Sequence, residues 1–203
     1  MFHCSKLQEN YILKQRTDSR SVEDYFRECE KESDYILSKL GNMKPARVLD
    51  IGCGMGGIAA LMSDSLGSTY YLFDKNDNGF DTLPNPYGFS AEPRYYNNIE
   101  LLQQFVTINR PEMKTFITDD INNIESEIGL IISTYSMGWH YPIEEYLDKI
   151  LQIHQSGGLM IIDIRTWNEY NRYIHQILVK DYIVLETDEI QPGKGYRYIL
   201  KRK

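Results

Sequence analysis

The chain has 203 residues and a formal net charge of −7, with 42% hydrophobic and 25% charged residues. This length fits one domain of ordinary globular composition, and no apolar run approaches the roughly 20 residues of a membrane-spanning helix. A negative net charge gives no general attraction to phosphate backbones or anionic lipids, so we expect neither a nucleic-acid partner nor a membrane partner.

The N-terminal residues, MFHCSKLQEN, lack the basic start and apolar middle of a secretory signal, which predicts a cytoplasmic location. The three cysteines have a spacing that matches no disulfide framework or zinc site, in line with that location. Residues 1–20 show no clear periodicity and are predicted to form an N-terminal arm or lid, with residues 11–13 folding over a pocket. Residues 21–203 are predicted to form a single domain.

Along this domain, helical periodicity alternates with short apolar runs. Ser21 has the side chain of a helix N-cap, and Gly41 is expected to end that first helix. The helices that follow are predicted at residues 58–66, 98–110, 142–156 and near 167–179. Strands are predicted at residues 46–51, 69–73, 114–118, 128–134 and 159–164, with a final hairpin of residues 182–186 and 196–200. This alternation indicates an α/β fold with a doubly wound sheet, whose ligands bind beyond the carboxyl ends of the strands.

The segment RVLDIGCGMGGIAAL, residues 47–61, combines a buried strand, a glycine turn and the start of a helix. Glycines let the backbone turn sharply and approach a ligand where a Cβ would collide. Gly52, Gly54 and Gly57 match the dinucleotide pattern G-x-G-x-x-G, and Asp74 lies near the distance expected for a ribose-binding carboxylate. The glycines alone therefore allow either NAD or S-adenosylmethionine.

Two observations favour S-adenosylmethionine. Asp50 precedes the turn, where its carboxylate attracts the ammonium group of a methionine part and repels a pyrophosphate. The third strand ends in Asp119-Asp120-Ile121, which offers an acceptor for the adenine amino group and an apolar side chain for the ring. The second half of the chain also lacks the Tyr-x-x-x-Lys pair of short-chain dehydrogenases. An NAD-dependent oxidoreductase stays as an alternative.

Five segments, in this order and spacing, resemble the successive motifs of class I S-adenosylmethionine-dependent methyltransferases: VLDIGCGMGG, YLFD, ITDDI, LIISTYSMGWHYP and GGLMIIDIR. The resemblance covers about Ser21 to Lys201 and implies a Rossmann-like seven-stranded sheet of order 3-2-1-4-5-7-6, with helices on both faces and the last strand antiparallel. One departure is the long loop of residues 75–97, where a helix would follow directly.

Carried over by position, the resemblance assigns a part of the cofactor to each loop. Gly52, Cys53 and Gly54 would contact the methionine part, Asp74 would take both ribose hydroxyls, and Ser133 to Tyr135 would border the sulfonium. Asp120 with Ile121 would hold the adenine. The predicted cofactor-binding residues are Asp50, Gly52, Cys53, Gly54, Asp74, Lys75, Asp119, Asp120, Ile121, Ser133 and Thr134.

The acceptor is expected to meet the methyl group at residues 136–142, SMGWHYP. A hydroxyl acceptor must lose its proton during attack, which requires a positioned base. We expect His140 to be that base, with Trp139 and Tyr141 shaping the acceptor face, and Tyr135 completes the predicted catalytic set. The stretch resembles that of sugar O-methyltransferases, so the predicted acceptor is a hydroxyl on a sugar or a similar small metabolite.

Alternatives remain at this point. His140 could be a structural residue that forms a hydrogen bond with a loop carbonyl. The acceptor could be a small amine or a protein. The chain could also be a binding module without catalytic activity. Asp163 either faces the acceptor pocket or binds a divalent ion with Asp119. Because no clustered ligand set is visible, no metal site is predicted.

Overall fold

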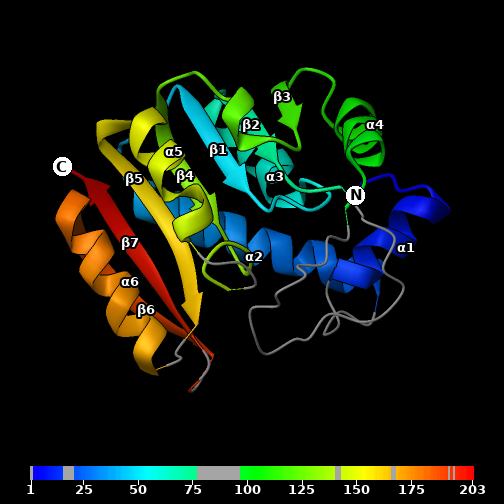
Figure 1. Ribbon diagram of the computed structural model, residues 1–203. Helices are drawn as coiled ribbons and strands as arrows, with labels where there is room; N and C mark the ends of the chain where they lie inside the picture. Colours follow the sequence, from blue (N-terminus) through cyan, green and yellow to red (C-terminus); the bar gives the residue numbers. More distant parts are fainter. Residues whose placement is uncertain are drawn as a thin grey trace.

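The computed structural model describes residues 2–15, 21–76, 97–139, 143–165, 168–191, 193 and 195–203. Its elements form a sheet with helices on both sides (Figure 1). The helices are α1 (Lys6–Gln15), α2 (Val22–Leu40), α3 (Gly57–Leu66), α4 (Ile99–Asn109), α5 (Glu144–Ile153) and α6 (Asn168–Asp181), with a short 3-10 helix η1 (Ile121–Asn123). The strands are β1 (Arg47–Ile51), β2 (Thr69–Phe73), β3 (Lys114–Thr118), β4 (Ile128–Ser133), β5 (His154–Arg165), β6 (Tyr182–Gln191) and β7 (Gly195–Arg202).

The seven strands pair in the order β3-β2-β1-β4-β5-β7-β6, which is the order that the family resemblance implies. The first five in sequence are parallel, whereas β7 is antiparallel to both β5 and β6. Because β1 to β4 run in one direction, the loops that follow them lie along one edge of the sheet. The order reverses between β1 and β4, which is where ligands bind in open sheets of this kind.

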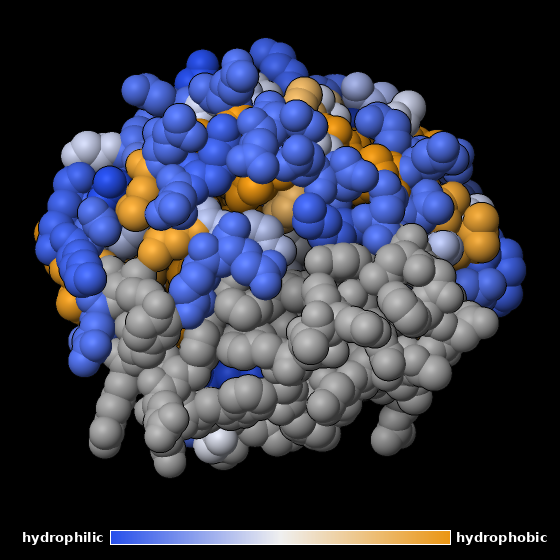
Figure 2. Space-filling view, viewed as in Figure 1, coloured by the Kyte–Doolittle hydropathy of each residue, from blue (hydrophilic) through white to orange (hydrophobic). Residues whose placement is uncertain are grey.

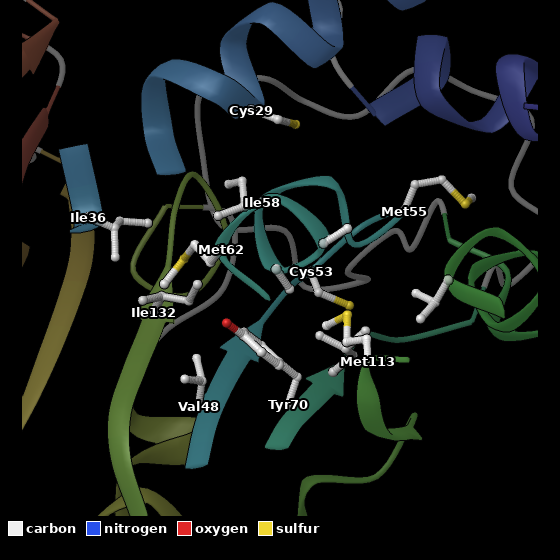
Figure 3. Close-up of a cluster of buried hydrophobic side chains, with 14 of the residues drawn as sticks. Cys29, Ile36, Val48, Cys53, Met55, Ile58, Met62, Tyr70, Met113 and Ile132 are labelled. Atoms are coloured by element: carbon white, nitrogen blue, oxygen red, sulfur yellow. The ribbon is translucent and has the colours of Figure 1, made fainter. Parts of the chain in front are cut away.

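Alternating side chains of the strands enter two hydrophobic layers. On one face, Val48 and Tyr70 pack with α2, α3 and α4, and Figure 3 shows these side chains beside Ile58 and Met62 of α3. On the other face, strand residues such as Leu49 pack with α5 and α6. Burial of β4 on both faces explains its uninterrupted apolar sequence.

Local signals placed several helix ends correctly. Ser21 Oγ accepts a hydrogen bond from the Asp24 N–H at 3.1 Å, so it caps α2 as predicted. Gly67 ends α3 with a φ of +60°, and its N–H donates to the Ser63 carbonyl at 3.4 Å.

The connection from α5 to β5 differs from the prediction. We expected the helix to reach Gly157, but α5 ends at Ile153 and β5 begins at His154. His154 pairs with Ile128 at the start of β4, and the register then shifts before Leu130 pairs with Leu159. Pairing with a distant strand thus overrides the local preference for helix, which sequence periodicity does not detect.

The N-terminal residues include a packed helix, α1, where only an arm was expected. Ile12 is fully buried, and the Gln8 side-chain amide donates to the Leu101 carbonyl of α4 at 3.0 Å. The His3 N–H and carbonyl also bond the Asn109 side chain, at 2.6 and 2.9 Å. This part of the segment is therefore attached to α4, while its role as a lid and the division of the chain at residue 20 stay predictions.

The surface of the described residues is mostly hydrophilic in the view of Figure 2, with smaller groups of hydrophobic side chains between the polar ones. Within the described ranges, every helix is too short or too polar to cross a lipid bilayer.

Candidate functional site at the carboxyl end of the sheet

The glycine turn after β1 bends over the end of β2. The Gly52 and Cys53 N–H groups donate to the Phe73 carbonyl at 2.8 and 3.3 Å, and the Gly56 N–H donates to the Cys53 carbonyl at 2.9 Å. Gly52, Gly54 and Gly56 have φ values of +72°, +57° and +73°, in the left-handed region that favours glycine. The strand, the turn and the helix of residues 47–61 are thus confirmed.

Gly52 also lies against the loop that follows β4. A Cβ at this position would be 1.8 Å from Ser136 Oγ, so no larger residue fits unless Ser136 moves. The two loops on either side of the sheet's reversal point are therefore in direct contact, and the neighbour that excludes a Cβ at Gly52 is Ser136, whereas the predicted approach of a ligand stays a prediction.

Asp74 is joined to the same turn. Its Oδ2 accepts a hydrogen bond from the Gly54 N–H at 2.7 Å, and its Oδ1 accepts one from the Lys75 N–H at 2.8 Å. Burial raises the pKa of Asp74 to about 6, against the opposing effect of these hydrogen bonds. The carboxylate predicted to bind a ribose thus lies beside the glycine turn, although 20 residues separate it from Gly54.

Asn97 is a member of this cluster that the sequence reasoning missed. Its side-chain amide donates to the Gly54 carbonyl at 2.6 Å and to Asp74 Oδ2 at 3.2 Å. The side chain is buried and its residue pairs with Asn76 in a parallel bridge. Asn97 carries no sequence signal for this role, because only the tertiary structure brings it beside Gly54 and Asp74. The predicted loop of residues 75–97 lies for the most part, from residue 77 to residue 96, outside the described residues.

Asp50 adds a second acidic group. It is only 3% exposed, and its Oδ2 has no hydrogen-bond partner among the described residues. Burial, with the nearby charge of Asp74, raises the pKa of Asp50 to about 8. Burial also raises the pKa of the Cys53 thiol, which keeps that group neutral. The site therefore favours a cationic ligand over an anionic one.

The end of β3 places the next predicted residues. Asp119 is exposed and its Oδ2 accepts from the Asn76 side chain at 3.0 Å, which links the ends of β2 and β3. Asp120 caps η1 through the Asn122 N–H at 2.9 Å, and this hydrogen bond lowers its pKa. Ile121 is buried in the core against α5, so little of its side chain faces outward.

The end of β4 is organised by Ser133. Its hydroxyl donates to the Ile51 carbonyl at 2.9 Å and accepts from the Met137 N–H at 3.0 Å, so it ties β1 to the loop that follows β4. Thr134 and Tyr135 are half-buried, and the Tyr135 ring meets the Trp139 ring edge-on at 5.3 Å. His140 and Tyr141 lie outside the described residues.

Asp163 does not face a pocket, contrary to one of our two expectations. It is fully buried, and both of its oxygens accept hydrogen bonds from Arg197, at 2.6 and 2.8 Å. The described parts of the chain bring together no group of three or more side chains that could hold a metal ion. Arg197 and its second partner, Glu32, are further residues near the site that the motifs did not indicate.

Comparisons with known proteins agree with this geometry. Residues 21–191 match the family model described as a methyltransferase domain. The fold is similar to the tRNA m1G37 methyltransferase of M. jannaschii, at a TM-score of 0.58 and 18% identity over 85% of this chain and 49% of that one. It is also similar to the precorrin-6y C5,15-methyltransferase of Geobacter metallireducens, at a TM-score of 0.58 and 13% identity over 85% of this chain and 88% of that one. A methyltransferase of Pyrococcus furiosus is similar at a TM-score of 0.54 and 14% identity, over 84% of this chain and 82% of that one.

These structural neighbours, at such low identity, show the fold. This chain spans about half the length of the tRNA methyltransferases that it matches, 45–49% of each. The family model covers most of the chain, from the first residue before α2 to the end of β6. The chain therefore belongs to the methyltransferase domain family.

Proposed function

We propose that this protein transfers a methyl group from S-adenosylmethionine to a hydroxyl of a small molecule, a sugar or a related metabolite, with His140 as general base. The observation that carries the cofactor assignment is the acidic pair at the glycine turn. Asp50 is buried with an oxygen that lacks a partner among the described residues, and Asp74 lies close enough to raise its pKa. A ligand with an ammonium group satisfies this charge, whereas the pyrophosphate of NAD is repelled.

The residues of the site fit such a cofactor. Gly52 has no room for a Cβ because Ser136 occupies that space, so the glycine turn and the loop after β4 meet where the methionine part is proposed to bind. In this proposal Asp74 accepts hydrogen bonds from the ribose hydroxyls, and Asp120 accepts one from the adenine amino group. When bound, S-adenosylmethionine supplies a methyl group on a positively charged sulfonium, which is activated for in-line displacement.

The protein contributes alignment and proton transfer. The loop after β4 contacts the turn through Ser136, so an acceptor bound against this loop lies next to the cofactor's methionine part. The half-buried Tyr135 ring, which meets the buried Trp139 ring edge-on, offers an aromatic face for a sugar ring. His140 follows Trp139 directly and would hold the proton that the hydroxyl releases, a role that rests on its place in the sequence.

RNA is the second class of acceptor to include in a test. Two of the solved structures that this chain resembles are tRNA methyltransferases, one of them in complex with tRNA. The net charge of −7 argues against a phosphate backbone as ligand for this chain. The absence of a nucleic-acid partner thus stays a prediction.

Two measurements test the proposal. Calorimetry should show binding of S-adenosylhomocysteine and none of NADH; the opposite result would make the chain an oxidoreductase. A panel of sugars, small amines, peptides and tRNA transcripts, scored by release of S-adenosylhomocysteine, then identifies the acceptor class. The Asp74→Asn protein is the control for methyl transfer that does not depend on this site. Turnover with amines or RNA alone would contradict the hydroxyl acceptor while leaving the cofactor assignment intact.

A further inference from the structure

Tyr135 has an unusual backbone for its residue type. Among the described residues it is the one non-glycine with a positive φ, +55°. A side chain in the left-handed region is crowded by its own carbonyl, so such a conformation persists only where surrounding contacts hold it. Tyr135 lies two residues after the end of β4, directly before Ser136, which covers Gly52.

One contact that holds Tyr135 comes from a buried ion-pair cluster. The Tyr135 N–H donates to Asp163 Oδ2 at 3.0 Å, and Arg197 donates to both oxygens of Asp163, from Nε at 2.6 Å and from Nη2 at 2.8 Å. The third guanidinium nitrogen of Arg197 donates to Glu32 Oε2 of α2 at 2.6 Å. The side chains of Asp163, Arg197 and Glu32 are 0%, 4% and 12% exposed.

The bidentate pair orients the carboxylate that Tyr135 needs. Without Arg197, the Asp163 carboxylate would lose the two hydrogen bonds that fix its rotation and would be a buried charge without its cationic partner. The two carboxylates also keep the pKa of Arg197 above its usual range, so the guanidinium stays charged. The cluster thus extends from α2 through β7 and β5 to the loop after β4.

The other end of this loop is held by the same two strands. The Arg165 N–H of β5 donates to the Gly138 carbonyl at 3.0 Å, and the Arg165 guanidinium lies 4.8 Å from the centre of the Trp139 ring. A Cβ at Gly195 of β7 would be 2.2 Å from that ring. Contacts with β5 and β7 therefore fix the position of the Trp139 ring. The Tyr135 ring reaches it only if the backbone of Tyr135 keeps its left-handed conformation.

We propose that Asp163, oriented by Arg197 and Glu32, is a positioning residue for methyl transfer: it holds Tyr135 in the left-handed conformation, so that Tyr135 and Trp139 form one wall of the acceptor site. This inference rests on the proposed function. A purely structural ion pair between β5 and β7 would affect stability alone, whereas a positioning residue also changes how the acceptor is bound and aligned.

The fluorescence of Trp139 tests the loop without knowledge of the acceptor. The chain has two tryptophans, so the Trp167→Phe protein reports Trp139 alone. In that background, Asp163→Asn should shift the emission to longer wavelength and increase quenching by acrylamide, because the edge-on contact with Tyr135 is lost. Leu200→Ala is the matched control, since it destabilises β7 from the core at its pairing with Met160, three strand positions away from Arg197 and Asp163.

The kinetic test uses the acceptor that the panel identifies. Asp163→Asn should lower kcat/KM for that acceptor about tenfold or more, because without this restraint Tyr135 leaves the left-handed conformation in most molecules. The Kd for S-adenosylhomocysteine should stay unchanged. Leu200→Ala should leave kcat/KM unchanged below its unfolding temperature. If Asp163→Asn does not fold, Arg197→Lys and Glu32→Gln are measured in the same way.

The outcomes separate the two proposals. Unchanged Trp139 fluorescence in folded Asp163→Asn, or an equal change in Leu200→Ala, would overturn the positioning role. A changed spectrum in a protein that binds no S-adenosylhomocysteine would retain the link between Asp163 and the loop but overturn the methyl-transfer function, and with it the role in catalysis.

Discussion

The Gly54 N–H donates a hydrogen bond of 2.7 Å to the Asp74 carboxylate, which joins the glycine turn after β1 directly to the end of β2. The two central acidic groups of the site, Asp50 and Asp74, are thereby held on either side of the same turn. Burial raises the pKa of both groups, to about 8 for Asp50, where the charge of Asp74 adds to the effect, and to about 6 for Asp74, where the Gly54 hydrogen bond opposes it.

Asp74→Asn should weaken binding of S-adenosylhomocysteine by about 30-fold or more, since a hydrogen bond to a charged group contributes about 2 kcal/mol. Calorimetry at pH 7.5 measures the change. Asp64→Asn is the control, because Asp64 forms an exposed ion pair with Arg110 on α4's side of the molecule, with 59% of its side chain exposed. Equal affinity in the Asp74→Asn and native proteins would remove Asp74 from the cofactor site.

Asp50 should make the ligand-free protein less stable as the pH rises. Its folded pKa of about 8 exceeds the ordinary value of 3.8, so the folded state binds the proton more tightly. The stabilisation is complete below the ordinary pKa and is lost as the pH rises through about 8. Asp50→Asn, which is neutral at every pH, should therefore exceed the native protein in free energy of unfolding by an amount that grows between about pH 4 and about pH 8, and denaturant unfolding at several pH values measures this difference. A native protein that gains stability relative to the variant over this range would contradict the raised pKa.

Cofactor binding should show the opposite pH dependence. A cationic ligand binds the ionised form of Asp50, so the affinity for S-adenosylhomocysteine should rise between pH 6 and 8, by at most about tenfold per pH unit. Calorimetry in buffers of different ionisation enthalpy should detect the released proton. In Asp50→Asn, the affinity for S-adenosylhomocysteine should no longer change with pH near pH 8. If it still changes there, the released proton comes from another group.

Gly52→Ala should destabilise the protein by about 2 kcal/mol or more, because it adds a Cβ at a φ of +72° and 1.8 Å from Ser136 Oγ. Gly67→Ala separates the two causes, since Gly67 has a φ of +60° with nothing within 4 Å of its Cβ, and about 1 kcal/mol is expected. Thermal unfolding measures both. Adding Ser136→Gly to Gly52→Ala should restore part of the lost stability. If it restores none, the contact with Ser136 is not the cause of the destabilisation at Gly52.

His140→Ala should lower kcat by about a hundredfold or more if the acceptor is a hydroxyl, because proton transfer by a positioned base contributes about that much. The dependence of kcat on pH should lose its lower ionisation, and the affinity for S-adenosylhomocysteine should be unchanged. His175→Ala, at an exposed position of α6, is the control. Native turnover and an unaltered pH profile would show that His140 is not the base.

Much of this fold follows from local patterns in the sequence. The apolar runs of the strands, the cap at Ser21 and the stop at Gly67 are encoded by residues a few positions apart, and the structure confirms them. The start of β5 was misplaced because His154 is held by pairing with Ile128, a contact across 26 residues. The helix α1 was missed for a similar reason, since its stability comes from packing on α2 and α4 more than from its own periodicity.

The sequence by itself determined the order of the motifs, the glycine turn and the two acidic residues that favour a cationic cofactor. These are short-range features, because a turn needs its glycines in place whatever lies around it. Only the tertiary structure decided that Asn97 joins Gly54 to Asp74, and that Glu32, Arg197 and Asp163 reach Tyr135. Such contacts bring together residues from distant elements, and no local pattern of side chains specifies which buried polar groups will become partners.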